Sequence, residues 1–127
     1  MIGACIASGG KLAALATTVF TLSWTHSVER TEWRERWHAS EAGLTLIEAR
    51  VKGSGAGMEP GEGAVLSDGW WIWKPSGPPV PSIVLASSGA TGSGWSLCYE
   101  QGSECMILGA IAAAPITITA CETTEKR

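Results

Sequence analysis

One cluster of residues in the chain could carry out nucleophilic chemistry: His26 and Ser27, followed by the carboxylates Glu29 and Glu32. A hydrolase needs a nucleophile beside a base, and an acid that orients the base. These residues lie in or just after a segment of alternating apolar and polar residues, which predicts a strand. Neighbours on a strand point to opposite faces, so His26 is poorly placed to activate Ser27. The sequence also lacks a Gly-x-Ser-x-Gly elbow, and we predict that the chain is not an enzyme.

The same region could instead bind a metal ion. His26, His38, Glu32 and Glu48 would converge if their strands pair suitably, and two histidines with carboxylates suit zinc or copper. The competing interpretation is that His26 is a hydrogen-bonded structural residue, because the residues before it on the same face are apolar. We favour the structural role and expect no metal and no cofactor. His26, Glu32 and Glu48 are kept as candidate binding residues.

A glycine-rich stretch over residues 52–63 contains five glycines in twelve residues. Such a stretch cannot pair steadily as a strand, which predicts a surface loop. Its backbone N–H groups could cradle an anion, but the spacing of a phosphate loop is missing and no predicted helix follows. We therefore expect a hairpin connection, with Gly55 and Gly57 as candidate contacts to a partner.

The aromatic composition is unusual, with seven tryptophans against one phenylalanine and one tyrosine. Indole rings supply large apolar areas, so such a domain has a heavy core, an aromatic recognition surface, or both. Strand alternation places Trp71 and Trp73 on one side, and Trp70 with Ile72 on the other. We expect at least two of these three tryptophans to be buried. An exposed pair of Trp71 and Trp73 would instead form a recognition platform for a protein or an amphipathic ligand.

The pattern of alternation and turns predicts the fold class. The segment 32–38 is predicted as a strand rather than a helix, because it lacks a clean cap and follows a strand at hairpin distance. Strands separated by glycine and proline turns predict an all-β fold, a small antiparallel sandwich or barrel of about seven to nine short strands. We also expect a short helical turn near the C-terminus. The predicted strands are 20–28, 32–38, 44–51, 64–66, 70–74, 82–86, 94–98 and 116–121, and the helical turn lies within 106–113.

The N-terminal residues 1–16 have the character of a processing segment. They are mostly small and apolar, and Ala14-Leu15-Ala16 has the small-x-small pattern that signal peptidase requires. The alternative is an ordinary buried N-terminal strand. We expect export to the periplasm, with a single β domain over residues 17–122 and a charged tail over 123–127. No apolar run reaches the roughly 18 to 20 residues of a membrane span, so the protein is not expected to span a membrane.

Removal of the first sixteen residues would leave three cysteines, Cys98, Cys105 and Cys121. None of them is near a histidine or part of a Cys-x-x-Cys pair, which disfavours a metal site. Cys98 and Cys105 flank a polar turn, so we expect a disulfide between them. Closing so short a loop contributes about 2 to 3 kcal/mol in the chain-entropy model. A bond between Cys98 and Cys121 is the alternative.

The charge pattern argues against nucleic acid as a partner. The formal net charge is −3 and both signs are mixed along the chain. No basic patch accompanies stackable aromatic residues outside the region from Trp33 to Trp37, so the electrostatic footprint of a nucleic-acid-binding protein is missing.

Several segments together resemble the bacterial domain of unknown function 1850 family. They are FTLSWTHSVERTEWRERW, LIEARVKGSGAGMEP, SDGWWIWKP and ASSGATGSGWSLC, and the resemblance covers roughly Phe20 to Cys121. It implies a small exported protein, often encoded beside the fused membrane component of a TRAP transporter of the TAXI type, and it implies no catalytic residues. We therefore expect an exported soluble binding or accessory protein with a membrane transporter component as its partner. The alternative is a periplasmic protein that binds a metal or small ligand with the His26 face.

Overall fold

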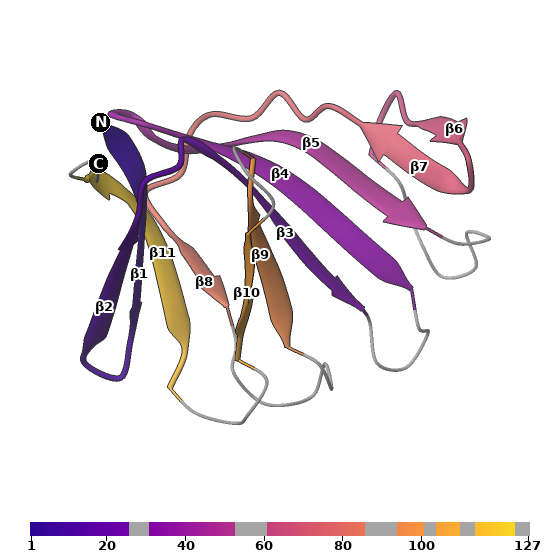
Figure 1. The fold of residues 1–127 in the computed structure, drawn as a ribbon. Coiled ribbons are helices and arrows are strands. Elements are labelled where there is room, and N and C mark those ends of the chain that lie inside the picture. The colour runs from indigo at the N-terminus through magenta and orange to yellow at the C-terminus, as the bar shows by residue number, and fades with distance from the viewer. Residues whose placement is uncertain (26–30, 53–60, 86–93, 101–103, 110–113, 124–127) are drawn as a thin grey trace.

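The structure of the protein, a computed structural model, describes residues 1–25, 31–52, 61–85, 94–100, 104–109 and 114–123. Strands are the only regular secondary structure in these residues. These residues form eleven strands in two antiparallel sheets (Figure 1). The predicted all-β class is confirmed. The arrangement is sandwich-like rather than a closed barrel, and it has more strands than expected. Within the same residues, no helix is long and apolar enough to cross a membrane.

The smaller sheet, sheet A, joins the two ends of the chain. Its order is β2-β1-β11-β8, with β1 at Ile2–Ser8, β2 at Lys11–Leu15, β8 at Ile83–Leu85 and β11 at Ile116–Glu122. The residues that resemble a processing segment thus form β1 and β2, joined by a turn in which Gly9 and Gly10 have φ angles of 57° and 84°. β1 pairs with β11, and a disulfide links Cys5 to Cys121. Cleavage after Ala16 stays a prediction, and it would remove two strands of this sheet.

The larger sheet, sheet B, carries the residues of functional interest. Its seven strands follow the order β10-β9-β3-β4-β5-β7-β6. Their bounds are β3 Val19–Thr25, β4 Glu32–Ser40, β5 Gly43–Lys52, β6 Val65–Ser67, β7 Trp70–Trp73, β9 Trp95–Tyr99 and β10 Cys105–Leu108. The turn between β6 and β7 has positive φ angles at Asp68 and Gly69, as the Asp-Gly pair requires.

The predicted helical turn near the C-terminus is wrong where the structure describes it. Residues 105–108 form β10, which pairs with β9 in an antiparallel hairpin. Met106 and Leu108 lie partly buried against the core, whereas Ile107 between them is 60% exposed. This two-residue period fits a strand at the edge of a sheet, and pairing with β9 decides between the two structures. Residues 110–113 lie outside the described residues.

A β-bulge interrupts the alternation that the sequence predicts for residues 44–51. Arg36 on β4 pairs with Glu48, but the next residue, Trp37, pairs with Leu46, so Ile47 has no partner in the register. The extra residue lets Leu44, before the bulge, lie on the same buried face as Ala49 and Val51 after it. Each face of β5 therefore keeps the same character, apolar or polar, on both sides of the bulge. The sequence alone suggests one unbroken alternation instead.

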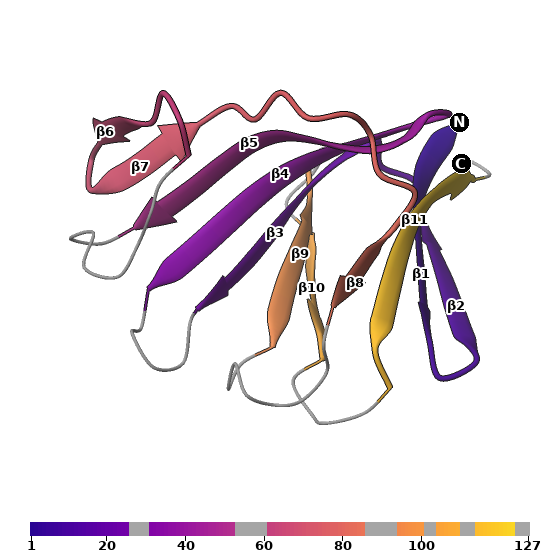
Figure 2. The ribbon, with the colours of Figure 1, turned by 180° about the vertical axis from the view of Figure 1, so that it is seen from behind.

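The hydrophobic core lies between the two sheets at one end of sheet B. Figures 1 and 2 show the sheets close together near the chain termini and diverging from there, with β7 and β6 farthest from sheet A. Sheet A approaches sheet B mainly at β4 and β5. The buried core residues are Ala4, Ile6, Leu15, Phe20, Leu22, Trp37, Ala39, Leu44, Leu85, Leu97, Ile116 and Ile118. Among the described residues, no strand of sheet A reaches the part of sheet B at β6 and β7 (Figures 1 and 2).

Candidate functional site

Sheet B separates the residues predicted to form a site onto its two faces. Trp71 and Trp73 pair directly with the buried Val51 and Ala49, so they point to the inner face, the face toward sheet A. Glu32 lies one position from Trp33, and the register places it on the outer face with the charged residues of β4 and β5. His26, Gly55 and Gly57 lie outside the described residues. The last described residues before those loops, Thr25 and Lys52, both pair with Glu32, so the strand ends meet at one end of sheet B.

Ion pairs account for the carboxylates on the outer face. Arg34 Nε donates to Glu32 at 3.0 Å, and an amino group of Arg50 donates to Glu48 at 2.8 Å. In the part of the chain that the structure describes, no three potential ligands gather in a way that could hold a metal ion. Glu32 and Glu48 therefore serve as partners for arginine on this face.

A shallow depression of about 200 Å³ lies among these ion pairs. Arg36 Nε donates to Glu100 at 2.8 Å, and this hydrogen bond raises the pKa of Arg36. The depression is lined by the neutral Thr21 and by charged residues of both signs: Arg34, Arg36, Glu48, Arg50 and Glu100. Each arginine has a carboxylate beside it, so the depression carries little excess positive charge.

Trp70 adds an aromatic contact to the same outer face. Arg34 and Arg50 are directly opposite one another on β4 and β5, an arrangement that repulsion between like charges disfavours. The Trp70 ring lies 4.6 Å from the guanidinium carbon of Arg34, 5.9 Å from that of Arg50 and 5.6 Å from the Lys52 ammonium. Cation–π attraction thus offsets part of the repulsion, and Trp70 has a structural role.

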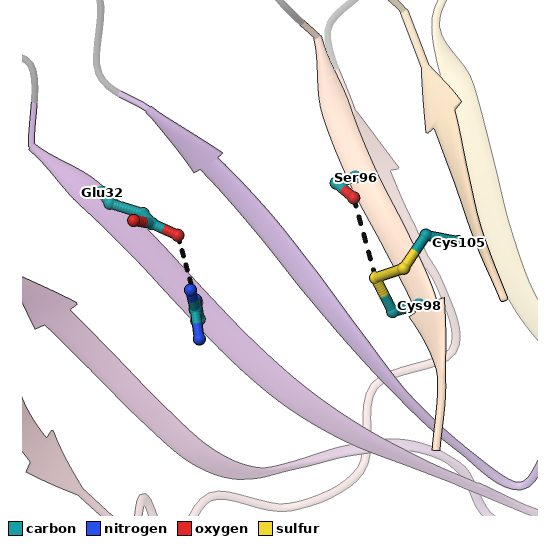
Figure 3. The surroundings of a disulfide bond; sticks show 5 residues. Glu32, Ser96, Cys98 and Cys105 are labelled. Carbon is teal, nitrogen blue, oxygen red and sulfur yellow. Dashed lines mark hydrogen bonds and ion pairs between the residues drawn. A yellow bond between two sulfur atoms is a disulfide. The ribbon is translucent and has the colours of Figure 1, made fainter. Parts of the chain in front are cut away.

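The outer face also carries the Cys98–Cys105 disulfide, which the polar turn between them predicts. The two cysteines are directly opposite one another on β9 and β10. Figure 3 shows the bond on the same face as Glu32, with the Ser96 hydroxyl 3.7 Å from the Cys98 sulfur. The bond fixes the outermost hairpin of sheet B and brings no further functional group to the site.

The inner face gathers four tryptophans from four strands, here called the tryptophan surface: Trp24, Trp33, Trp73 and Trp95. The Trp24 and Trp33 rings are nearly parallel, with centroids 6.2 Å apart. The Trp24 and Trp95 centroids are 4.7 Å apart, and Trp73 meets Trp33 edge to face at 6.5 Å. Residues remote in the sequence therefore form one aromatic surface, because strand pairing places β9, β3 and β4 side by side and only β5 separates β4 from β7.

The tryptophan surface differs from the core in its exposure. Trp37 is buried at 8% exposure, whereas all four members of the surface are half-buried. Trp33 and Trp73 lie outside the core cluster and flank the buried Val51 and Ala49 on β5.

The expectation that at least two of Trp70, Trp71 and Trp73 are buried is wrong, since each keeps part of its surface exposed. For Trp71 and Trp73 the physical reason is the position of β7, which lies beyond the area that sheet A covers (Figure 2), whereas Trp70 points to the outer face.

Glu35 is the residue of this face that the sequence analysis missed. It lies between Trp33 and Trp37 on β4 and pairs with the buried Leu22 and with Ala49, so its carboxylate points to the apolar side. The Trp37 indole N–H donates to this carboxylate at 3.1 Å. Burial raises the pKa of Glu35, and the hydrogen bond from Trp37 opposes part of that rise. The signal was present in the sequence, because alternation from Trp33 to Trp37 places the residue midway between them on the same side.

Comparison with known proteins agrees with the resemblance of the sequence. The family model described as Domain of unknown function (DUF1850) matches residues 20–106. This range covers β3 to β9 almost completely, and it contains all four residues of the tryptophan surface together with Glu35. No match is found among curated proteins or among solved structures. The chain therefore belongs to the DUF1850 family, whose matched region contains both faces of the central strands of sheet B.

Proposed function

We propose that the protein is an exported binding protein without enzymatic activity, which works as an accessory to a TRAP transporter of the TAXI type and uses the tryptophan surface for binding. The observation that carries the binding role is the gathering of four half-buried tryptophans on the inner face of sheet B, where Trp24 and Trp95 pack against the core and Trp33 and Trp73 lie outside it. Large apolar area that stays partly open to solvent is typical of interaction surfaces. Tryptophan is also the residue type most enriched among the energetic centres of interfaces.

Two observations support the cellular setting of the proposal. The cysteines form two disulfides, Cys5–Cys121 and Cys98–Cys105, and such bonds persist in oxidising compartments such as the bacterial periplasm. The transporter association comes from the resemblance of the sequence to exported proteins encoded beside the fused membrane component of such transporters. A membrane protein partner at the periplasmic surface follows from both.

Co-purification from the native cell envelope tests this function. The tagged protein is expected to capture a membrane component of a TRAP transporter, identified by mass spectrometry. A Trp33→Leu/Trp73→Leu variant should lose the capture, because it removes indole area from two strands while keeping both positions apolar. Trp70→Leu is the matched control, since Trp70 lies on the same strand as Trp73 but faces the opposite side.

Circular dichroism and thermal unfolding of each variant establish that the comparison is between folded proteins. Capture that is equally strong in the double variant and in the wild type would exclude the tryptophan surface as the binding surface. Capture of no membrane transporter component would exclude the accessory role.

A further inference from the structure

We propose that the tryptophan surface, together with Glu35, binds an organic cation: an ammonium group with small apolar substituents. This inference rests on the proposed function, because it names the chemical class of the ligand, or of the partner's group, that the same surface takes. It follows from a charge on the inner face of sheet B that no positively charged side chain of the central strands balances.

Glu35 carries the only formal charge on the inner face of β3, β4, β5, β7 and β9 in the residues that the structure describes. The registers of these strands place the residues of this face in direct pairs, and all of the others are apolar or aromatic. The arginines of β4 and β5 point to the outer face, where each has a carboxylate partner. The negative charge of Glu35 is therefore separated by the sheet from the nearest cluster of positive charge.

The hydrogen bond that Glu35 accepts does not neutralise it. The indole N–H of Trp37 contributes one dipole at 3.1 Å, whereas a buried carboxylate usually has a charged partner or several donors. A cation that approached the carboxylate from the solvent side would supply the missing charge. Glu35 is itself half-buried, so its surroundings stay accessible from that side.

The aromatic rings beside Glu35 favour the same ligand. Trp33 is two residues away on the same strand and face, and Trp24 is directly opposite Trp33. The face of an indole ring carries negative electrostatic potential and attracts cations within about 6 Å of its centroid. Trp73 meets Trp33 at an interplanar angle of 86°, so the rings present faces in more than one direction. A carboxylate that shares a sheet face with several indole rings is complementary to an ammonium group whose apolar substituents contact the rings.

The geometry also explains why the outer face is not the site for such a ligand. Trp70 already has Arg34, Arg50 and Lys52 within 6 Å of its ring. Cations of the chain itself occupy the attractive region of that indole. Trp24, Trp33 and Trp73, by contrast, have no lysine or arginine on the described strands of their own face.

Binding of choline, measured by calorimetry and by tryptophan fluorescence on the intact chain, tests the inference. Its neutral isostere 3,3-dimethylbutan-1-ol, in which carbon replaces the nitrogen, serves as the paired probe. We expect choline to bind at least about tenfold more tightly than the alcohol, as desolvated cation–π and carboxylate contacts imply. Equal affinity for the two probes, or binding of neither, would overturn the inference.

Glu35→Gln gives the sharpest variant, because the amide oxygen can still accept the Trp37 hydrogen bond while the charge is removed. It should lower the affinity for choline at least about tenfold and leave that for the alcohol unchanged. Glu48→Gln on the outer face is the matched control and should alter neither. Near-ultraviolet circular dichroism verifies that the tryptophan packing of each variant is intact. Unchanged choline affinity in a folded Glu35→Gln protein would contradict the assignment of Glu35.

The two proposals fail in different ways. Loss of transporter capture in the Trp33→Leu/Trp73→Leu variant, without any choline binding by the wild type, would overturn the organic cation and keep the tryptophan surface. Choline binding that depends on Glu35, with transporter capture that does not depend on the tryptophans, would overturn the accessory role and keep the cation site.

Discussion

At the scale of single residues, Glu35 is a side chain whose burial in the charged form opposes folding. Burial raises its pKa above the ordinary value of 4.5. The folded chain therefore holds the proton more tightly than the unfolded chain does. The resulting stabilisation is fully present at a pH below the unfolded pKa and is lost as the pH rises through the folded pKa. At neutral pH the ionised carboxylate thus lowers stability, which suits a residue retained for binding rather than for packing.

Glu35→Gln should accordingly raise the free energy of unfolding at pH 7 and change it much less at pH 4. The paired residues Leu22 and Ala49 and the flanking Trp33 and Trp37 carry no titratable group, so the difference reports on Glu35 itself. Urea denaturation of wild type and variant at the two pH values measures it. A stabilisation of the same size at both pH values would contradict the account.

At the scale of elements, period-two alternation predicted most of sheet B but could not reveal interruptions of the period. The hairpin of β3 and β4 and the tight Asp68-Gly69 turn agree with the sequence, because local chemistry determines both. The bulge at Ile47 is not a property of the local sequence. The register with β4 shifts by one residue at Ile47, so the bulge depends on how both parts of β5 pair with β4. β10 was missed as a strand for a similar reason: its partner β9 decides its structure.

Deletion variants of β5 test the bulge. Deleting Ile47 should leave the protein folded, because Leu46 and Ala49 keep their inward orientation when the unpaired residue is removed. The cost should be on the order of 1 to 3 kcal/mol, for the lost burial of one aliphatic side chain. Deleting Arg50, where the alternation is regular, should prevent folding, since Val51 would then turn from the core side to solvent. Thermal unfolding followed by circular dichroism distinguishes the two, and equal damage from both deletions would argue against the bulge.

The candidate site shows the same limits of prediction at the scale of elements. Trp71 and Trp73 could be assigned to one side of a strand from their spacing alone, and the structure places them there. The contact of Trp73 with Trp33 on β4 depends on the strand order, which the spacing of residues does not contain. The residue types of Glu32 and Glu48 suit a binding site, but each carboxylate forms an ion pair with the arginine two residues away on its own strand.

At the scale of the whole molecule, sheet A holds together the two ends of the chain. β1 lies between β2 and β11, and Ala4 and Ile6 of β1 belong to the buried core. If residues 1–16 are removed, as the sequence predicts, Cys5 is lost and Cys121 has no partner. The sequence-based prediction therefore does not include the Cys5–Cys121 bond. Only the pairing of β1 with β11, in which Gly3 is opposite Cys121, brings Cys5 within bonding reach.

The two disulfides should therefore differ in what they contribute to stability. Cys5–Cys121 closes a loop with a sequence separation of 116, against 7 for Cys98–Cys105. Chain entropy predicts about 4.7 kcal/mol for a loop of roughly 100 residues and about 2 to 3 kcal/mol for a loop of under ten. Replacing Cys5 and Cys121 by serine should cost about 2 kcal/mol more than replacing Cys98 and Cys105, as measured by urea denaturation. Equal costs would show that the long loop is already restricted in the unfolded chain.

Counting thiols on the denatured, unreduced protein from its native envelope connects this bond to the fate of the N-terminus. A chain that keeps β1 should contain no free thiol, because all four cysteines are paired. A chain cleaved after Ala16 would lose Cys5 and expose one thiol, at Cys121, and N-terminal sequencing would then begin at Thr17. Such a chain would also lack Ala4, Ile6 and Leu15 from its core and would leave β11 paired on one side only, so its free energy of unfolding should fall by several kcal/mol. One free thiol in a protein as stable as the uncleaved chain would show that sheet A does not need β1 and β2.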